Sequence, residues 1–181
     1  MASHIASLIM EAMNAECCQN FAGPKHTLVD FHRMMTRLVE MEDSQYSYRN
    51  VLAAYTSSGI LAGICVAYDG AKLHQLRHRF YEAALEAFGI DYTGMTDETE
   101  DGEFYIDSLA VSSNFRGKGI ASQLLQATIE RGAELEIPTV GLLVDKGNPK
   151  AEALYQRLGF VYVNDSTWGG HPMRHLQYKQ N

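Results

Sequence analysis

A strand-like run, a glycine-containing turn and a helix-like run follow one another after residue 103, and this unit constrains the fold more than any other feature. The run "EFYIDSLAV" at 103–111 has strand composition, and "NFRGKGIASQLL" at 114–125 carries two glycines and two cations before an apolar, helix-like segment. The apolar "TVGLLVD" follows at 139–145. A strand, a helix and a second strand in this order form a crossover unit, so strands 103–111 and 139–145 are predicted to be parallel neighbours.

The remaining elements are predicted from hydrophobic spacing and turn residues. Ser3 is expected to cap the first helix, and Thr27 with Asp30 is expected to cap the second. Two apolar runs joined by "SSG" within 50–70 read as a hairpin, which makes the rest of the sheet antiparallel. We therefore expect an α/β (α+β) fold whose mixed, mostly antiparallel sheet has a parallel central pair. The other expected elements are helices at 3–13, 27–41, 71–88, 119–135 and 149–158 and strands at 160–163 and 171–179.

Composition and charge limit the class of protein. A chain of 181 residues with 46% hydrophobic content is long enough to bury the core of one domain, here residues 1–181. Its net charge of −7 argues against nucleic acid and anionic membranes as partners. The longest apolar run, at 60–68, is too short to span a bilayer, and no signal peptide is evident. The three cysteines form no disulfide framework or metal site, which favours reduced thiols and a cytoplasmic location.

The turn from Arg116 to Ala121 has the features of an anion site. The first backbone N–H groups of a helix lack intrahelical partners, and the helix dipole is positive there. Gly117 and Gly119 remove side chains that would keep a phosphate from those amides, and Lys118 or Arg116 can add a charge contact. Glycines also serve as ordinary turn residues, so the turn alone leaves both interpretations open.

Two motifs together resemble those of the GNAT superfamily, the acyl-CoA-dependent N-acetyltransferases. The family's turn, [R/Q]-x-x-G-x-[G/A], is matched by Arg116, Gly119 and Ala121. Its later motif, N-x-x-A-x-x-L-Y-x-x-x-G-F, is matched within "NPKAEALYQRLGF" at 148–160. The resemblance is strong over about residues 100–163. It departs at the N-terminus, where a helix stands in place of the family's usual first strand.

The resemblance implies a bound acetyl-CoA and no metal. The pyrophosphate would be held by backbone amides of the turn, and the pantetheine arm would lie between strands 103–111 and 139–145. Asn148 would contact the arm from the start of the next helix. The implied cofactor-binding residues are Leu109, Ala110, Val111, Arg116, Gly117, Lys118, Gly119, Ile120, Ala121 and Asn148.

The chemistry of acetyl transfer points to two catalytic residues. An aliphatic amine has a pKa of about 10.4 in water, so a base, a water relay or desolvation must assist its deprotonation. Asp107, expected to share a strand face with Tyr105, Leu109 and Val111, is the candidate base, with a purely structural carboxylate as the alternative. Glu103 is a weaker candidate. By the family match, Tyr155 is the general acid that protonates the departing sulfur.

The acceptor side of the site is predicted less sharply. The segment 71–102 is expected to be an insertion that shapes the acceptor pocket. Its acidic part, 91–103, carries six acids and no base, and either attracts a cationic acceptor or forms a solvated loop. Trp168 either folds over the acceptor or simply packs. Tyr46, Tyr48 and Arg49 are further candidate lining residues, whereas His74 and His78 fit a solvated helix face better than a metal site.

Two functions are therefore considered. The first is an N-acetyltransferase that moves an acetyl group by direct attack of a primary amine on acetyl-CoA, the acceptor being a small molecule, a peptide N-terminus or a lysine. The second is a non-catalytic acyl-CoA-binding regulatory domain. A homodimer is common in the family, although no residue pattern here demonstrates one.

Overall fold

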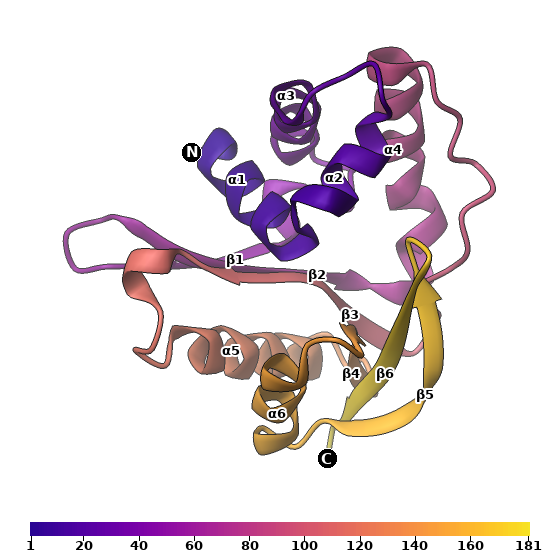
Figure 1. Ribbon diagram of the computed structural model, residues 1–181. Helices are drawn as coiled ribbons and strands as arrows, with labels where there is room; N and C mark the ends of the chain where they lie inside the picture. The colour runs from indigo at the N-terminus through magenta and orange to yellow at the C-terminus, as the bar shows by residue number, and fades with distance from the viewer.

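The computed structural model describes residues 1–181, and its helices lie on both faces of one six-stranded sheet (Figure 1). No helix combines the length and the hydropathy that crossing a bilayer requires. Three short 3-10 turns lie at Tyr48–Asn50, Gly70–Lys72 and Ser113–Phe115. The helices and strands are α1 (Ala2–Met13), α2 (Ala15–Ala22), α3 (Leu28–Glu40), β1 (Val51–Tyr55), β2 (Leu61–Asp69), α4 (Leu73–Phe88), β3 (Glu103–Val111), α5 (Ile120–Glu134), β4 (Thr139–Asp145), α6 (Pro149–Arg157), β5 (Val161–Trp168) and β6 (His171–Lys179).

The sheet confirms the predicted mixed topology. Its strand order is β1-β2-β3-β4-β6-β5, and only the central pair β3–β4 is parallel. β2 is buried along almost its whole length, as its unbroken apolar sequence requires, because helices cover both faces of the sheet. The hairpin β5–β6 closes one edge and β1 forms the other.

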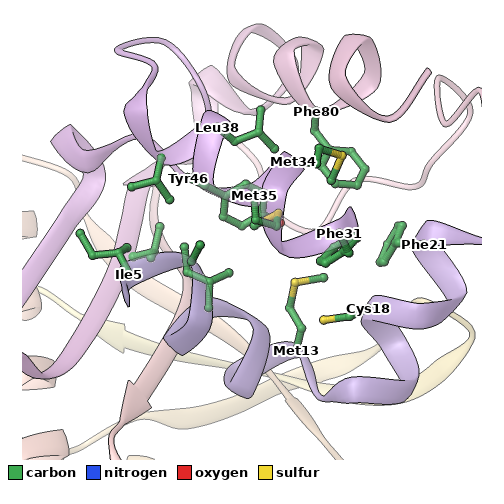
Figure 2. Packing of buried hydrophobic residues seen from close by; sticks show 14 of the residues in the cluster. Ile5, Met13, Cys18, Phe21, Phe31, Met34, Met35, Leu38, Tyr46 and Phe80 are labelled. Atoms are coloured by element: carbon green, nitrogen blue, oxygen red, sulfur yellow. The ribbon is translucent and has the colours of Figure 1, made fainter. Parts of the chain in front are cut away.

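The helices α1 to α4 cover one face of the sheet and α5 and α6 cover the other (Figure 1). On the first face, Phe31, Met35 and Leu38 of α3 are fully buried, and Figure 2 shows them packed with residues of α1, α2 and α4. Phe21 meets Phe80 edge to face, with ring centroids 5.5 Å apart. This cluster attaches the N-terminal helices to the sheet.

The second cluster lies beneath the sheet, between the strands and α5. Leu125 of α5 is essentially inaccessible to solvent, and so is Phe160, the last residue of the motif at 148–160 that includes α6 (the α6 motif). Ile106 of β3 and Leu142 of β4 pack into the same cluster. The parallel pair is therefore fixed by α5, the crossover helix that connects its two strands.

Local signals set the helix boundaries of α3 and α4 as predicted. The Thr27 hydroxyl accepts from the Asp30 backbone N–H at 3.3 Å, and the Asp30 carboxylate accepts from the Thr27 N–H at 2.9 Å. This reciprocal capping box satisfies two N–H groups that the helix leaves unpaired. Gly89 ends α4 in a left-handed conformation, with φ of +70°.

Two boundary predictions were wrong. Ser3 lies inside α1 instead of capping it, and Asn14, with φ of +69°, interrupts the N-terminal region and starts the unpredicted helix α2. The Asn14 side chain accepts from the Cys17 N–H at 2.9 Å, a local bond that competes with continuation of α1. β5 extends to Trp168, well beyond residue 163, since pairing with β6 stabilises its polar sequence on the edge of the sheet.

Candidate active site

A gap opens between β3 and β4 in the middle of the sheet. Their parallel pairing is limited to Glu103–Ile106 with Thr139–Leu142, after which the two strands diverge. The Ser112 N–H donates to Ala62 O at 2.9 Å on the β2 side. Because hydrogen-bonded residues alternate along an antiparallel strand, the N–H and C=O groups of Leu109 and Val111 face away from β2 and into the gap.

Asp107 occupies a bulge at the point of divergence. Val66 is opposite Ser108 and Ala67 is opposite Ile106, so Asp107 has no partner in β2. A bulge breaks the alternation of side chains, and Leu109 accordingly packs in the α5-side cluster, with Ile106. The prediction that Asp107, Leu109 and Val111 share one face by simple alternation was therefore wrong. The sequence carried no signal for the extra residue.

One cavity of about 310 Å³ occupies this region and brings the main candidates together. Its walls include Asp107 and Leu109 of β3, Asn148 and Tyr155 of the α6 motif, and Trp168 of β5. These residues come from segments far apart in the sequence, and the divergence of β3 and β4 lets all of them reach one space. Ala110, in contrast, buries its side chain among the N-terminal helices and pairs with Ile64 of β2, so it does not face the gap.

The glycine turn before α5 presents free backbone donors. No backbone N–H group from Arg116 to Ser122 donates to another protein group. Gly117 and Gly119 have φ of +73° and +78°, and a Cβ added at either would meet no other atom within 4 Å. Gly119 is also the N-cap of α5 and supplies no capping side chain. The unpaired amides of a 15-residue helix therefore remain available to a ligand.

The two cations of the turn are not equivalent. The Arg116 Nε–H donates to Val111 O at 3.0 Å, and its guanidinium lies 3.4 Å from the Glu11 carboxylate. Arg116 thus fastens the turn to the end of β3 and to α1. The Lys118 ammonium lies 5.4 Å from the ring centre of Phe115 and has no carboxylate partner. Lys118 is the cation that remains available for a charged ligand.

Tyr155 is oriented by the start of α6. Asn148 caps the helix by accepting from the Ala151 N–H at 3.2 Å, and Pro149 fills the first helical position, where a missing N–H costs nothing. The Tyr155 ring meets Phe160 edge to face at 6.0 Å, and its hydroxyl has no protein hydrogen-bond partner. Burial raises the pKa of Tyr155, so the phenol keeps its proton at neutral pH.

The environment of Asp107 raises its pKa to near neutral pH. Its Oδ2 accepts from the Tyr68 hydroxyl at 3.1 Å and its Oδ1 from the Ser108 hydroxyl at 2.9 Å. Burial, followed by the charge of Glu98, raises the pKa of Asp107 from 3.8 to about 7, against the opposing effect of these hydrogen bonds. A carboxylate with such a pKa accepts a proton readily near pH 7.

Glu98 is a site residue that the sequence reasoning did not identify. Its buried carboxylate accepts from Gln45 Nε2 at 3.3 Å, lies 3.3 Å from the Tyr68 hydroxyl oxygen and lies 3.2 Å from Arg77. The interpretation of the acidic stretch as a solvated loop was wrong for Glu98 and Thr99, each 8% exposed. A signal was available: Arg77 shares the apolar face of α4 with residues 73, 80 and 84, and a buried cation requires a carboxylate partner.

Other candidates lie outside the cavity. Glu103 accepts from His175 at 2.6 Å, from Gln177 at 2.7 Å and from Thr99 at 2.8 Å, and these bonds make it a structural carboxylate that joins β3 to β6. Residues 46, 48 and 49, the further candidates for lining the acceptor pocket, do not line this cavity. Tyr46 is buried against Phe80, and Tyr48 and Arg49 both interact with Glu42 at the surface. On α4, residues 74 and 78 interact with neighbouring acids.

Comparison with known proteins identifies the class of protein to which this chain belongs. The family model described as "Acetyltransferase (GNAT) family" matches residues 36–160, and the chain belongs to this family. A crystal structure of an acetyltransferase superposes with a TM-score of 0.80 at 25% identity, covering 98% of this chain and 94% of the other. An N-acetyltransferase structure from Staphylococcus aureus Mu50 gives a TM-score of 0.78 at 20% identity, again over 98% and 94% of the chains.

Curated relatives match over shorter segments. A "Probable spermine N(1)-acetyltransferase" of Bacillus subtilis subsp. natto (strain BEST195) is 27% identical over 94 residues, which are 50% of this chain and 62% of that protein. A "Mycothiol acetyltransferase" of Propionibacterium freudenreichii is 35% identical over 78 residues, 42% of this chain and 24% of that protein. The chain thus spans less than two thirds of the length of these relatives.

Proposed function

We propose that the protein is a cytoplasmic N-acetyltransferase that transfers an acetyl group from acetyl-CoA to a primary amine by direct attack. The observation that carries the proposal is the single cavity at the β3–β4 gap. It joins a carboxylate with a pKa of about 7, Asp107, to a protonated phenol, Tyr155. A carboxylate that can take up a proton near neutral pH and a phenol that keeps its proton there suit a base and an acid.

The residues around the gap fit acetyl-CoA. The free amides of the turn at 116–121 suit a pyrophosphate, and Lys118 supplies a further positive charge. The outward-facing peptide groups of Leu109 and the N–H of Val111 suit the amides of a pantetheine arm, because a strand with an open edge can pair with an extended ligand. The Asn148 side chain uses its oxygen for the helix cap, which leaves its NH₂ group free to donate into the cavity.

Asp107 and Tyr155 then divide the proton transfers of the reaction. Asp107 accepts a proton from the acceptor ammonium, directly or through a water molecule, which yields the nucleophilic amine. The amine nitrogen bonds to the thioester carbonyl carbon, the C–S bond breaks, and the nitrogen releases its remaining extra proton to solvent water. Tyr155 donates its proton to the departing sulfur. The buried cysteines take no part, since burial raises the pKa of Cys17 to about 11 and of Cys65 to about 12.

Two measurements test the proposal. Calorimetry is expected to show that coenzyme A binds to the purified chain. Absence of binding would contradict the assignment of the turn amides as a phosphate site. A thiol-release assay with acetyl-CoA and a panel of primary amines is expected to show turnover with at least one of them. Coenzyme A binding without release for any amine would support the alternative, a regulatory acyl-CoA-binding domain. Spermine belongs in the panel, because one relative is named a "Probable spermine N(1)-acetyltransferase".

A further inference from the structure

A small chamber extends from the main cavity toward the N-terminal helices, and its chemistry differs from that of the rest of the site. Its volume is about 100 Å³, and it shares Asp107, Leu143, Trp168 and Met173 with the larger cavity. Glu98 lines this chamber but not the larger cavity. The chamber is therefore a small pocket whose lining combines apolar side chains with two carboxylates, one of which is the proposed base.

The two carboxylates share too few donors. The Tyr68 hydroxyl lies 3.1 Å from Asp107 Oδ2 and 3.3 Å from Glu98 Oε1, but it has a single proton to give. Gln45 Nε2 donates to the Tyr68 oxygen at 3.0 Å and to Glu98 at 3.3 Å. Arg77 neutralises Glu98, and Asp107 has no cationic partner of its own. When Asp107 is ionised, the chamber therefore lacks one positive charge, and Tyr68 cannot donate to both carboxylates at once.

Trp168 adds an aromatic wall to this pocket. Its ring packs against Phe21 with centroids 5.6 Å apart, which fixes it over the chamber. The indole Nε1–H is buried and approaches Glu98 closely enough to favour the ionised carboxylate, but it forms no hydrogen bond of good geometry. An indole beside two carboxylates is a favourable setting for an ammonium group, which gains both charge pairing and a cation–π contact.

We propose that this chamber is the acceptor subsite and that it takes the terminal ammonium of an unbranched primary alkylamine, R–CH₂–NH₃⁺. This inference rests on the proposed function and names the substrate class of the same site. One ammonium supplies the missing charge and three donors. A water molecule occupies about 30 Å³, so a chamber of about 100 Å³ holds an ammonium and roughly two methylene groups. A branch at the amine carbon adds a carbon to the group that must fit within that volume, and a neighbouring carboxylate, as in a free α-amino acid, is repelled by Glu98 and Asp107.

Trp168 makes the chamber directly observable, because it is the only tryptophan of the chain. We would titrate 1-aminobutane into the protein saturated with coenzyme A and record tryptophan emission. The expected result is a saturable change. 2-Aminobutane should bind at least about 10-fold more weakly, as rejection of one misplaced carbon typically allows, and neutral 1-butanol should give no saturable change. Equal affinity for the linear and branched amines would overturn the proposal.

Charge variants test the role of Glu98. Glu98→Gln leaves Arg77 in excess and should weaken 1-aminobutane binding by about 10-fold or more, whereas Glu100→Gln, an exposed carboxylate of the same loop, should not. Glu98→Gln leaves the buried Arg77 without its carboxylate partner. A double variant that also carries Arg77→Gln removes both charges and should recover part of the affinity for 1-aminobutane. Thermal unfolding checks that each variant is folded. If Glu98→Gln does not fold, the comparison of linear and branched amines on the unaltered protein still decides.

The outcomes separate this inference from the proposed function. Acetyl transfer to 1-aminobutane with no change in Trp168 emission would refute the chamber and leave the acetyltransferase activity standing. Saturable, linear-selective amine binding with no release of thiol from acetyl-CoA would support the chamber and refute the proposed catalysis.

Discussion

Replacing Asp107 with asparagine is expected to stabilise the folded protein above neutral pH while abolishing acetyl transfer. Burial and the Glu98 charge raise the pKa of Asp107 from 3.8 to about 7. A carboxyl whose pKa is higher in the folded state binds its proton more tightly there than in the unfolded chain. The free energy of unfolding therefore falls as pH rises from about 4 to about 7, and the full penalty persists above pH 7.

The size of this penalty follows from the pKa difference. A difference of about 3 pKa units corresponds to about 4 kcal/mol at about 1.36 kcal/mol per unit. Because the Asp107 side chain borders a cavity that admits water, we expect about 2–4 kcal/mol at pH 8. Asparagine keeps a carbonyl oxygen that can accept from Tyr68. At pH 4 the two proteins should differ by much less.

The other titratable groups near Asp107 do not obscure the stability difference between the unaltered protein and Asp107→Asn. The pKa values of Tyr46, Tyr68 and Tyr105 are raised well above 10 by burial, so these phenols stay neutral between pH 4 and 8. Arg77 stays charged throughout. Burial also raises the pKa of Glu98, and this carboxyl is present in both proteins. The difference between the proteins therefore reports Asp107 together with its coupling to Glu98.

Urea unfolding of the unaltered protein and of Asp107→Asn at pH 4, 5.5, 7 and 8 measures the effect. Asp101→Asn, an exposed acid of the neighbouring loop, is the matched control and should show a small difference that does not depend on pH. The reasoning is refuted if Asp107→Asn is no more stable than the unaltered protein at pH 8, or if its advantage is the same at every pH. A gain in stability with a loss of turnover is typical of a group selected for chemistry.

Three other substitutions test separate parts of the structure. Tyr155→Phe is expected to lower kcat by about 100-fold, as loss of a general acid does, and to leave coenzyme A affinity unchanged by calorimetry; the exposed Tyr162→Phe should alter neither. Gly119→Ala should weaken coenzyme A binding by calorimetry, whereas Gly59→Ala, with a similar φ of +81° in the β1–β2 turn, should bind normally. Thr27→Ala should reduce the free energy of unfolding by about 1 kcal/mol, measured in urea, through loss of the α3 cap; no loss would contradict that role.

Much of the fold followed from local sequence, because the relevant interactions are local. Thr27 and Asp30 lie three residues apart and form their capping box within one helical turn. The crossover from 103–111 to 139–145 could be predicted as parallel since a helix between two strands brings them back in the same direction. The free amides of the glycine turn could likewise be predicted, because the first turn of any helix lacks backbone acceptors for its N–H groups.

The catalytic environment depended on contacts that no local pattern specifies. The bulge at Asp107 arises from the register between β3 and β2, and a one-residue shift in pairing leaves no mark in a strand's own composition. Glu98 lies near Asp107 because Arg77, on the buried face of α4, forms an ion pair with Glu98 and holds this part of the acidic loop in the interior. The position of Trp168 over the chamber likewise required the pairing of β5 with β6.

The sequence by itself thus determined the strand and helix order, the parallel pair and the turn with unpaired amides. Only the tertiary structure decided which carboxylates meet, how far the pKa of Asp107 rises and which side chains line the cavity at the β3–β4 gap. The physical reason is that helix capping and crossover geometry depend on neighbours along the chain, whereas desolvation and charge coupling depend on neighbours in space.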